Sequence, residues 1–439
     1  MALSGSRLEP VGRLRRLGLA RVDRVTAAIW LSGLAIRLVL MPFTAHLDLY
    51  HIYSRSADAV YHGQWLEWGS QLVIQMLHNG WFWLIHWLLP HNEGIWSPSA
   101  GVMGAGANWG EFRDLFITYP YLPRALFLMK LPYVASDLAT GYVLTRLVAP
   151  ERRRFVLAFW LLNPLVIYTS AAYGRHDSIA VLMVALSLLL ALRERRVAGL
   201  ALLGLAAVTR FFPAFLAPFY VVAFSRSRRE ASLLLGGLVA IWGVVEVSAL
   251  VLTGSSPTLT LLTHYQHIDY LVDLSLPLTL HDSLFLFPAA FTLLTLWFVE
   301  RRPAGADAYA AAGAAVFLVL FALTFFHPPY AIWLVPFLAL TIDRDRKLLV
   351  YHGLQIVLIA LFAFQWSSEM TVDLLLPLGK GLADGLPNPL LVIAGQVPIA
   401  LFFGVVRSVF TAVSLWMAYR ILRARFGPLT TWRTGDATG

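Results

Sequence analysis

The sequence predicts an all-α protein that crosses a membrane many times, and three observations support this prediction. Of the 439 residues, 58% are hydrophobic and only 13% are charged, whereas soluble globular proteins have roughly 45–50% apolar and roughly 25% charged residues. Stretches of about 20 apolar residues, long enough to span a bilayer as a helix, recur along the whole chain. Most basic residues lie in short clusters between these stretches, which is typical of cytoplasmic loops.

The composition also excludes several classes of site. The chain has no cysteine, so disulfides, thiolate metal sites and a cysteine nucleophile are excluded. Seven basic clusters hold 25 of the 34 Lys and Arg residues. The net charge of +9 therefore reflects orientation in a bilayer, and no nucleic-acid partner is expected.

Twelve spans are predicted, with both termini in the cytoplasm. The first, residues 25–42, follows the basic N-terminal segment 1–24 and is interpreted as a retained anchor. The apolar stretch 197–224 lies between two basic clusters and is interrupted at Arg210 and Pro213. Because proline disfavours a continuous helix, we interpret this stretch as two short helices in a hairpin with Arg210 at its tip. The remaining predicted spans are 122–147, 155–172, 179–192, 231–252, 284–299, 309–326, 330–342, 348–365 and 397–421.

The predicted organisation is one transmembrane domain, residues 25–424, followed by a cytoplasmic tail, residues 425–439. Residues 43–121 form a long external segment in this topology. Two helices that lie in the membrane interface are expected within it, near residues 54–68 and 71–89. The second combines tryptophans with histidines, an amphipathic mixture suited to the headgroup layer.

Charged residues outside the basic clusters are candidates for function, because an unpaired charge at a helix centre costs at least about 2.5–3.5 kcal/mol. Nine basic residues lie outside the cytoplasmic clusters, and in the predicted topology most of them fall on or near the external half of the membrane. They are Arg37, Arg55, Arg113, Arg124, Lys130, Arg175, Arg210, Lys380 and Arg407.

Asp48 lies just after the first span, at the expected outer membrane edge. A carboxylate shielded from bulk water there could have a raised pKa and act as a general base towards a sugar hydroxyl. The alternative is a solvated loop acid.

The turn Arg175-His176-Asp177 and the hairpin residue Arg210 could together grip a phosphate. A polar cap between two helices is the alternative for the turn, and an arginine that snorkels to the interface is the alternative for Arg210. His327, before two prolines and Tyr330, could serve a phosphate or a leaving group, or it could be a simple turn histidine.

Lys130 and Asp137 are two helical turns apart and are expected to face the same side of one helix. Asp137 inside an apolar helix needs a partner, and a structural ion pair is the favoured interpretation over a role in the site.

Five short motifs together resemble the GT-C superfamily of polytopic glycosyltransferases, in particular bacterial polyprenol-phosphate-mannose-dependent mannosyltransferases and the GPI mannosyltransferase I group. Their order and placement along residues 48–336 carry the resemblance. The motifs are His46-Leu47-Asp48-Leu49-Tyr50, Lys130-Leu131-Pro132-Tyr133 with Asp137-Leu138, Tyr173-Gly174-Arg175-His176-Asp177-Ser178-Ile179, Gly204-Leu205-Ala206-Ala207-Val208-Thr209-Arg210 with Pro213, and His327-Pro328-Pro329-Tyr330-Ala331-Ile332-Trp333.

The resemblance implies an inverting transferase with its active site on the extracytoplasmic face of a bacterial plasma membrane. It would move a hexose, mannose by resemblance, from a polyprenyl-phosphate donor to a hydroxyl of a glycolipid, glycan or protein. Asp48 and His327 would be catalytic, and Arg175, His176 and Arg210 would bind the donor phosphate. The supporting residues would be Asp177, Lys130, Asp137 and Tyr330.

The sequence departs from the family pattern at several positions. Arg210 stands where the family hairpin usually has lysine, and the turn reads Arg-His-Asp where Gly-Gln-X-Asp is commoner. Some members bind a metal through a second acid, but leucines flank Asp48, so neither a metal nor another cofactor is expected. Two alternatives stay open: a flippase or small-solute transporter without chemistry, and a polysaccharide polymerase or ligase with a different lipid-linked donor.

Overall fold

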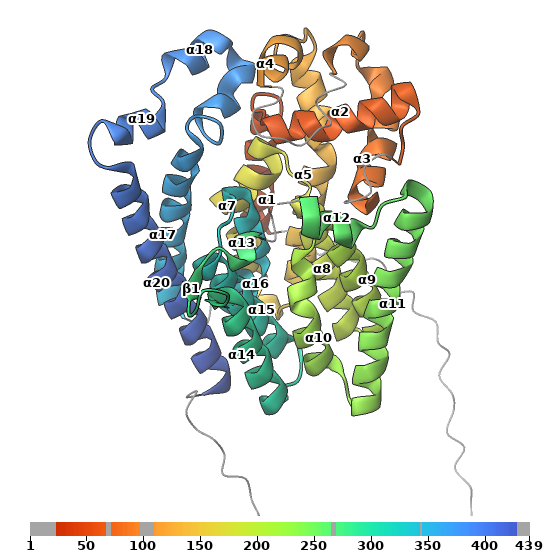
Figure 1. The fold of residues 1–439 in the computed structure, drawn as a ribbon, viewed down its shortest axis with the longest axis vertical. Helices are drawn as coiled ribbons and strands as arrows, with labels where there is room; N and C mark the ends of the chain where they lie inside the picture. The colour runs from red at the N-terminus through yellow and green to blue at the C-terminus, as the bar shows by residue number, and fades with distance from the viewer. Residues whose placement is uncertain (1–22, 67–71, 97–108, 265–268, 343–344, 428–439) are drawn as a thin grey trace, which may run out of the picture.

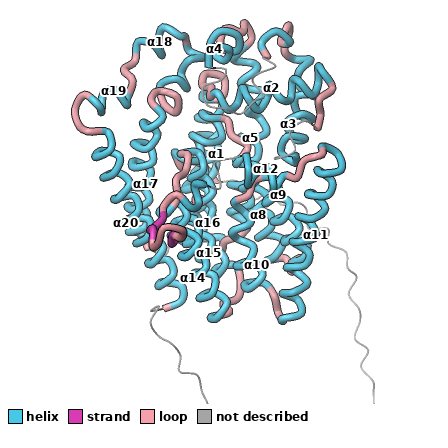
Figure 2. Tube along the Cα trace, in the orientation of Figure 1, coloured by secondary structure: helices cyan, strands magenta, loops and turns pink. Residues whose placement is uncertain are grey.

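The computed structural model describes residues 23–66, 72–96, 109–264, 269–342 and 345–427, which are largely helical, with one small hairpin of strands (Figure 2). Figure 1 shows a bundle whose long helices run roughly along one axis, while α2 (Leu47–His62) crosses its upper end. Three short helices lie at that same end: α4 (Trp109–Glu111), α18 (Lys380–Gly385) and α19 (Pro389–Ala394). The predicted cytoplasmic N-terminal segment lies outside the described residues except for its last two, and so does most of the predicted tail.

Four helices of the described chain are long and apolar enough to cross a membrane. A fifth span results if a bent helix pair within residues 150–173 counts as one. The four helices are α11 (Arg228–Thr253), α15 (Ala306–Leu323), α17 (Arg346–Ala363) and α20 (Ile399–Phe426). α11 buries only two of its residues although it is strongly apolar, as expected for a helix that faces lipid, whereas α15 is buried within the bundle. These are the features of an α-helical membrane protein.

Each stretch predicted as a span contains helix, although several helices are short or broken. The predicted span 155–172 is divided into α6 (Arg153–Leu161), α7 (Pro164–Ile167) and a π-helical turn (Tyr168–Tyr173), with a bend of 50° between the first and the rest. The number of twelve crossings stays a prediction. The other helices in predicted spans are α1 (Arg24–Leu40), α5 (Leu122–Arg146), α8 (Asp177–Leu192), α14 (Leu286–Arg301) and α16 (Val335–Thr341), the last preceded by a 3-10 helix (Pro328–Trp333).

The stretch interrupted at Arg210 folds as a helical hairpin. α9 (Arg196–Thr209) ends where Arg210 adopts an extended backbone conformation, and α10 (Ala217–Phe224) follows a 3-10 turn (Phe212–Leu216). The Tyr220 hydroxyl of α10 donates a hydrogen bond to the Arg196 carbonyl at 2.9 Å, so α10 returns to the start of α9. Arg210 therefore lies at the turn end of the hairpin, as predicted.

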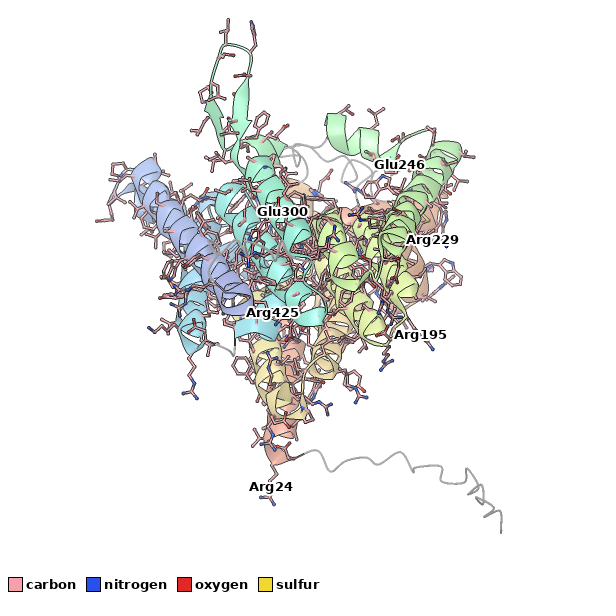
Figure 3. All side chains as sticks on the ribbon, turned by 90° about the horizontal axis from the view of Figure 1, so that it is seen from below. Arg24, Arg195, Arg229, Glu246, Glu300 and Arg425 are labelled. Carbon is pink, nitrogen blue, oxygen red and sulfur yellow. The ribbon has the colours of Figure 1, made fainter. Side chains whose placement is uncertain are left out.

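Basic clusters that are far apart in sequence meet through ion pairs. Arg154 contacts Asp23 at 3.3 Å, and Nε of Arg420 donates to Asp345 at 2.7 Å. Figure 3 views the molecule from below and labels Arg24, Arg195, Arg229 and Arg425, which lie at ends of α1, α9, α11 and α20. This arrangement fits the expectation that the clusters share one side of the membrane.

The external segments contain more regular structure than predicted. The two expected interfacial helices correspond to α2 and to α3 (Leu72–Ile85), but α2 begins at Leu47, so Asp48 lies on a helix and not in a loop. The segment 253–283 holds short elements: α12 (Pro257–His264), α13 (Asp269–Val272) and β1 (Ser275–Pro277), which pairs antiparallel with β2 (Ser283–Phe285). Residues 67–71 and 97–108 of the first external segment lie outside the described residues.

Candidate active site

The amino-terminal end of α2 holds Asp48 against a turn between α7 and α8. Nδ1 of His46, the N-cap residue, accepts a hydrogen bond from the Asp48 N–H at 3.0 Å. The His46 ring stacks on the Tyr173 ring with centroids 3.8 Å apart. Burial lowers the pKa of His46 to about 4, so its imidazole is neutral and can accept this hydrogen bond.

The two carboxylate oxygens of Asp48 lie in different surroundings. Oδ2 accepts hydrogen bonds from Nη1 of Arg175 and from the Tyr173 hydroxyl, the latter at 3.0 Å. Oδ1 accepts no hydrogen bond from the described residues, and the side chain is 37% exposed. Burial raises the pKa of Asp48, but the charge of Arg175 outweighs this effect and holds the pKa below its usual range, so the expectation of a raised pKa is wrong. Asp48 is therefore ionised, with one oxygen fixed and the other open.

Arg175 connects three parts of the site through its guanidinium group. Nε donates to Oδ2 of Asp177 at 2.9 Å, Nη1 contacts Asp48, and Nη2 donates to the Tyr330 hydroxyl at 3.2 Å. The backbone can turn here because Gly174 has a φ of +78°, and a Cβ at Gly174 would lie 2.9 Å from Cε of Lys130. The local sequence thus permits the turn and leaves room for the lysine beneath it.

Asp177, the first residue of α8, is fully buried and joins Arg175 to the hairpin. Its Oδ1 accepts hydrogen bonds from Nε of Arg210 at 3.1 Å and from Nε1 of Trp333 at 2.8 Å. A continuous polar chain therefore runs from Asp48 through Arg175 and Asp177 to Arg210. The structure brings together four of the residues that the sequence singled out.

Nitrogen atoms without partners cluster at the far end of this chain. Nη2 of Arg210 and both ring nitrogens of His176 are buried and have no hydrogen-bond partner among the described residues. The His176 ring lies 5.2 Å from that of His78 on α3, whose Nε2 is 2.9 Å from the Tyr133 hydroxyl. Burial and the Arg210 charge lower the pKa of His176, so its ring is neutral. Buried donors without partners are uncommon in proteins and mark a place where a ligand can supply the acceptor.

His327 lies beside this chain and makes ring contacts. Its ring centroid is 5.6 Å from that of Tyr330 and 4.9 Å from that of Trp366. The Tyr330 ring in turn lies 5.0 Å below the Arg175 guanidinium and 5.3 Å below that of Arg210. Burial, followed by the Arg175 charge, lowers the pKa of His327 to about 4, so this imidazole is neutral.

Lys130 and Asp137 do not pair with each other. Asp137 instead accepts hydrogen bonds from Nε and Nη2 of Arg37 at 2.6 and 3.1 Å. Nζ of Lys130 donates to the carbonyl oxygens of Thr44, Ala171 and Ala172 at 2.5–3.0 Å. The expectation of a structural ion pair at Asp137 agrees with this geometry, but its partner is on α1, which spacing within one helix could not reveal. Lys130 therefore links the backbone segment that precedes Asp48 to the segment that precedes Tyr173.

An apolar cavity of about 550 Å³ opens next to His327, between α15, α17 and α20. Trp366 and Phe325 line it, and both rings also contact the His327 ring. Arg407 of α20 lies in the cavity wall, with Nη2 donating to the Ala322 carbonyl at 3.2 Å. A second, polar cavity of about 270 Å³ is lined by residues that follow Trp366, among them Ser367 and Ser368.

Several residues of the site, His46 and His78 among them, were not singled out by the sequence. Tyr173 and Trp333 stand within quoted motifs, yet aromatic residues are so frequent in this chain that neither drew attention. The signal that could have found Tyr173 is its position next to the charged turn, because an aromatic side chain with a hydroxyl can hydrogen-bond to such a turn. Within the described ranges, no group of three or more His, Asp or Glu side chains is placed to hold a metal ion.

Comparison with known proteins gives one family match. Residues 115–226 match the model of the alpha-(1->6)-mannopyranosyltransferase family, N-terminal domain. No curated protein matches the chain. The matched region contains the Arg175–Asp177 turn and Arg210 but neither Asp48 nor His327. The match is to a mannosyltransferase family and supports a GT-C mannosyltransferase-like assignment for this protein.

Proposed function

We propose that this protein transfers mannose from a polyprenyl-phosphate donor to an acceptor hydroxyl, with inversion at the anomeric carbon. The observation that carries the proposal is the Asp48 carboxylate. Arg175 and Tyr173 fix Oδ2, whereas Oδ1 is open and can accept a proton.

In the proposed reaction, Asp48 Oδ1 takes the proton of the acceptor hydroxyl while the oxygen attacks C1 of the mannose. The bond between C1 and the phosphate oxygen breaks, and its electron pair leaves with the polyprenyl phosphate. Nη2 of Arg210 and the N–H of neutral His176 would donate to the phosphate as its charge develops. His327 would position the leaving group from its place between Tyr330 and the apolar cavity.

The apolar cavity suits the polyprenyl chain of the donor. Two aromatic residues of its lining contact the His327 ring, and His327 in turn contacts the Tyr330 ring. The guanidinium groups of Arg175 and Arg210 lie over the Tyr330 ring. A lipid whose tail occupies the cavity could therefore place its phosphate near these guanidinium groups.

The proposal includes the membrane arrangement expected from the sequence. Twelve crossings in a single domain (residues 25–424) would place both termini in the cytoplasm and the active site on the extracytoplasmic face of a bacterial plasma membrane. The meeting of basic clusters at helix ends supports one cytoplasmic side. Labelling of single cysteines introduced at Arg226 and at Lys380, in intact cells, tests the orientation, since only the second should react from outside.

Purified protein in liposomes tests the proposed activity. Radiolabelled polyprenyl-phosphate mannose and octyl α-mannoside should give a labelled disaccharide glycoside with an α-linkage if the donor is β-linked. Product with retained configuration would contradict the mechanism. Movement of the labelled lipid between leaflets without any product would replace the proposal with the flippase alternative.

A further inference from the structure

The polar cavity lined by Ser367 and Ser368 is not used by the donor chemistry. Its volume of about 270 Å³ is below the roughly 300–1,000 Å³ of sites for drug-sized ligands, and it suits a single sugar ring. The wall combines an indole, hydroxyls, an amide and carboxylates. Its polar and aromatic lining includes Trp109, Ser367, Ser368, Glu369, Asp373 and Asn388.

Backbone contacts hold this cavity against the residues that carry Asp48. The Ala45 N–H donates to the Leu374 carbonyl at 3.0 Å, and the Tyr168 hydroxyl donates to the Met370 carbonyl at 3.0 Å. Burial raises the pKa of Glu369, and the charges of Asp373 and Asp48 add to this effect. The two hydrogen bonds place the backbone next to Glu369 and Asp373 against the segments that lead to Asp48 and Tyr173.

The charges in the wall exclude a phosphate. Three carboxylates line the cavity, and Arg113 donates to both oxygens of one of them, Asp384, at 2.7 and 2.8 Å. Glu369 and Asp373 are left without a basic partner among the described residues, although the Ser368 hydroxyl donates to Asp373 at 2.6 Å. An anionic wall repels the donor phosphate, which the cationic residues around Arg210 attract.

Neutral sugars match the remaining chemistry. Carboxylates accept hydrogen bonds from hydroxyls. The Ser367 hydroxyl accepts from Asn388 and can donate to a ligand, whereas the Ser368 hydroxyl donates to Asp373 and can accept from one. The Trp109 indole can cover the apolar C–H face of a sugar ring. A ligand that offers many hydroxyls and no charge fits this set of groups.

We propose that the polar cavity binds the acceptor of the reaction as an uncharged, hydroxyl-rich sugar residue, which directs one hydroxyl towards the open oxygen of Asp48. This inference rests on the proposed function. It separates the two substrates: the donor enters from the apolar cavity lined by Trp366, and the acceptor enters from the polar cavity lined by Ser367 and Ser368.

Substitution of Glu369 tests this inference, because its carboxylate makes no hydrogen bond among the described residues. Glu369→Gln and Trp109→Leu should each raise the KM for octyl α-mannoside by about tenfold. The KM for polyprenyl-phosphate mannose, and the slow hydrolysis of this donor without acceptor, should change by less than about twofold.

A matched control is available at the other end of the molecule. Glu194 lines a cavity of the same volume, about 270 Å³, formed by basic-cluster residues. Glu194→Gln should leave both KM values unchanged. If Glu369→Gln and Trp109→Leu keep the wild-type KM for the mannoside, the acceptor site is wrong while the transferase activity stands. If the wild-type protein neither hydrolyses nor transfers from the donor, the proposed function and this inference both fail.

Discussion

Asp137 and Asp48 each pair with an arginine from a distant part of the chain, and they differ in how completely the carboxylate is satisfied. Asp137 is fully buried, and its oxygens accept hydrogen bonds from Arg37, from the Ser170 hydroxyl and from the Trp160 indole. Asp48 shares only Oδ2 with its partners and is partly exposed. The first carboxylate has no oxygen left for a substrate, whereas the second has one.

This difference separates a structural role from a chemical one within the same bundle. Removing one partner of a buried ion pair leaves an uncompensated charge, so the effect of such a change falls on folding. A partly exposed carboxylate with a free oxygen can change its hydrogen bonds without disturbing the core. The number of free oxygens, and not the presence of an arginine, therefore distinguishes the two acids.

Replacement of Asp48 should produce the largest loss of activity. In Asp48→Asn the amide oxygen can keep the contacts of Arg175 and Tyr173, but no group can take the acceptor proton. We expect mannose transfer to fall by about 10²–10⁴-fold. The variant should keep the wild-type thermal stability in detergent. Wild-type transfer by this variant would assign the base elsewhere, and a large loss of stability would place Asp48 in the same class as Asp137.

Replacement of Asp137 should have the opposite pattern. Asp137→Asn leaves Arg37 buried without a counter-charge, and we expect a loss of about 3–5 kcal/mol in the free energy of unfolding. Thermal denaturation of the purified variant in detergent measures this. The double variant Arg37→Met with Asp137→Leu should recover much of the stability, because replacing a whole buried pair by apolar residues is often neutral or better. Lost activity with intact stability in the single variant would break the comparison.

Much of the helical pattern could be predicted from the sequence, because in a bilayer backbone groups must be satisfied within helices or closed barrels. Apolar stretches and proline positions therefore indicated the bundle and the break at Arg210. The start of α2 was missed, since the segment around Asp48 is not apolar and its N-cap is His46, which is not a usual capping residue. Asp48 was accordingly expected in a loop.

The charged members of the candidate site could be found from the sequence, but their partners could not. Arg175, Asp177 and Arg210 stood out because charges near apolar helices need a reason. That Asp177 joins both arginines depends on how the hairpin packs against α8, and the partner of Asp137 depends on how α1 packs against α5. Helix spacing reports which residues share a face and contains no information about which helix lies opposite.

Arg210→Lys should weaken donor binding without changing the fold. Lysine keeps a positive charge but cannot both hold Asp177 and present a second donor in the planar geometry of Arg210. We expect the KM for polyprenyl-phosphate mannose to rise about tenfold, equivalent to about 1.4 kcal/mol, with the KM for octyl α-mannoside unchanged. Initial-rate measurements with each substrate varied in turn decide this. An effect on the mannoside alone would place Arg210 on the acceptor side of Asp48.

The pH dependence should show the smallest effect, and it tests whether Asp48 or a histidine is the base. The pKa values of His46 and His327 are lowered to about 4 from about 6.5, so their neutral forms stabilise the fold above pH 6.5 or so, and this stabilisation is lost as the pH falls towards 4. The pKa of Asp48 is also lowered, so Asp48 stays ionised throughout this range. We therefore expect kcat/KM to vary by less than about twofold between about pH 5 and about pH 8. Stability should decline as the pH falls from about 6.5 towards about 4. An acidic limb centred near pH 6.5 would instead report a histidine base with an ordinary pKa, and the open oxygen of Asp48 would then have no role in proton transfer.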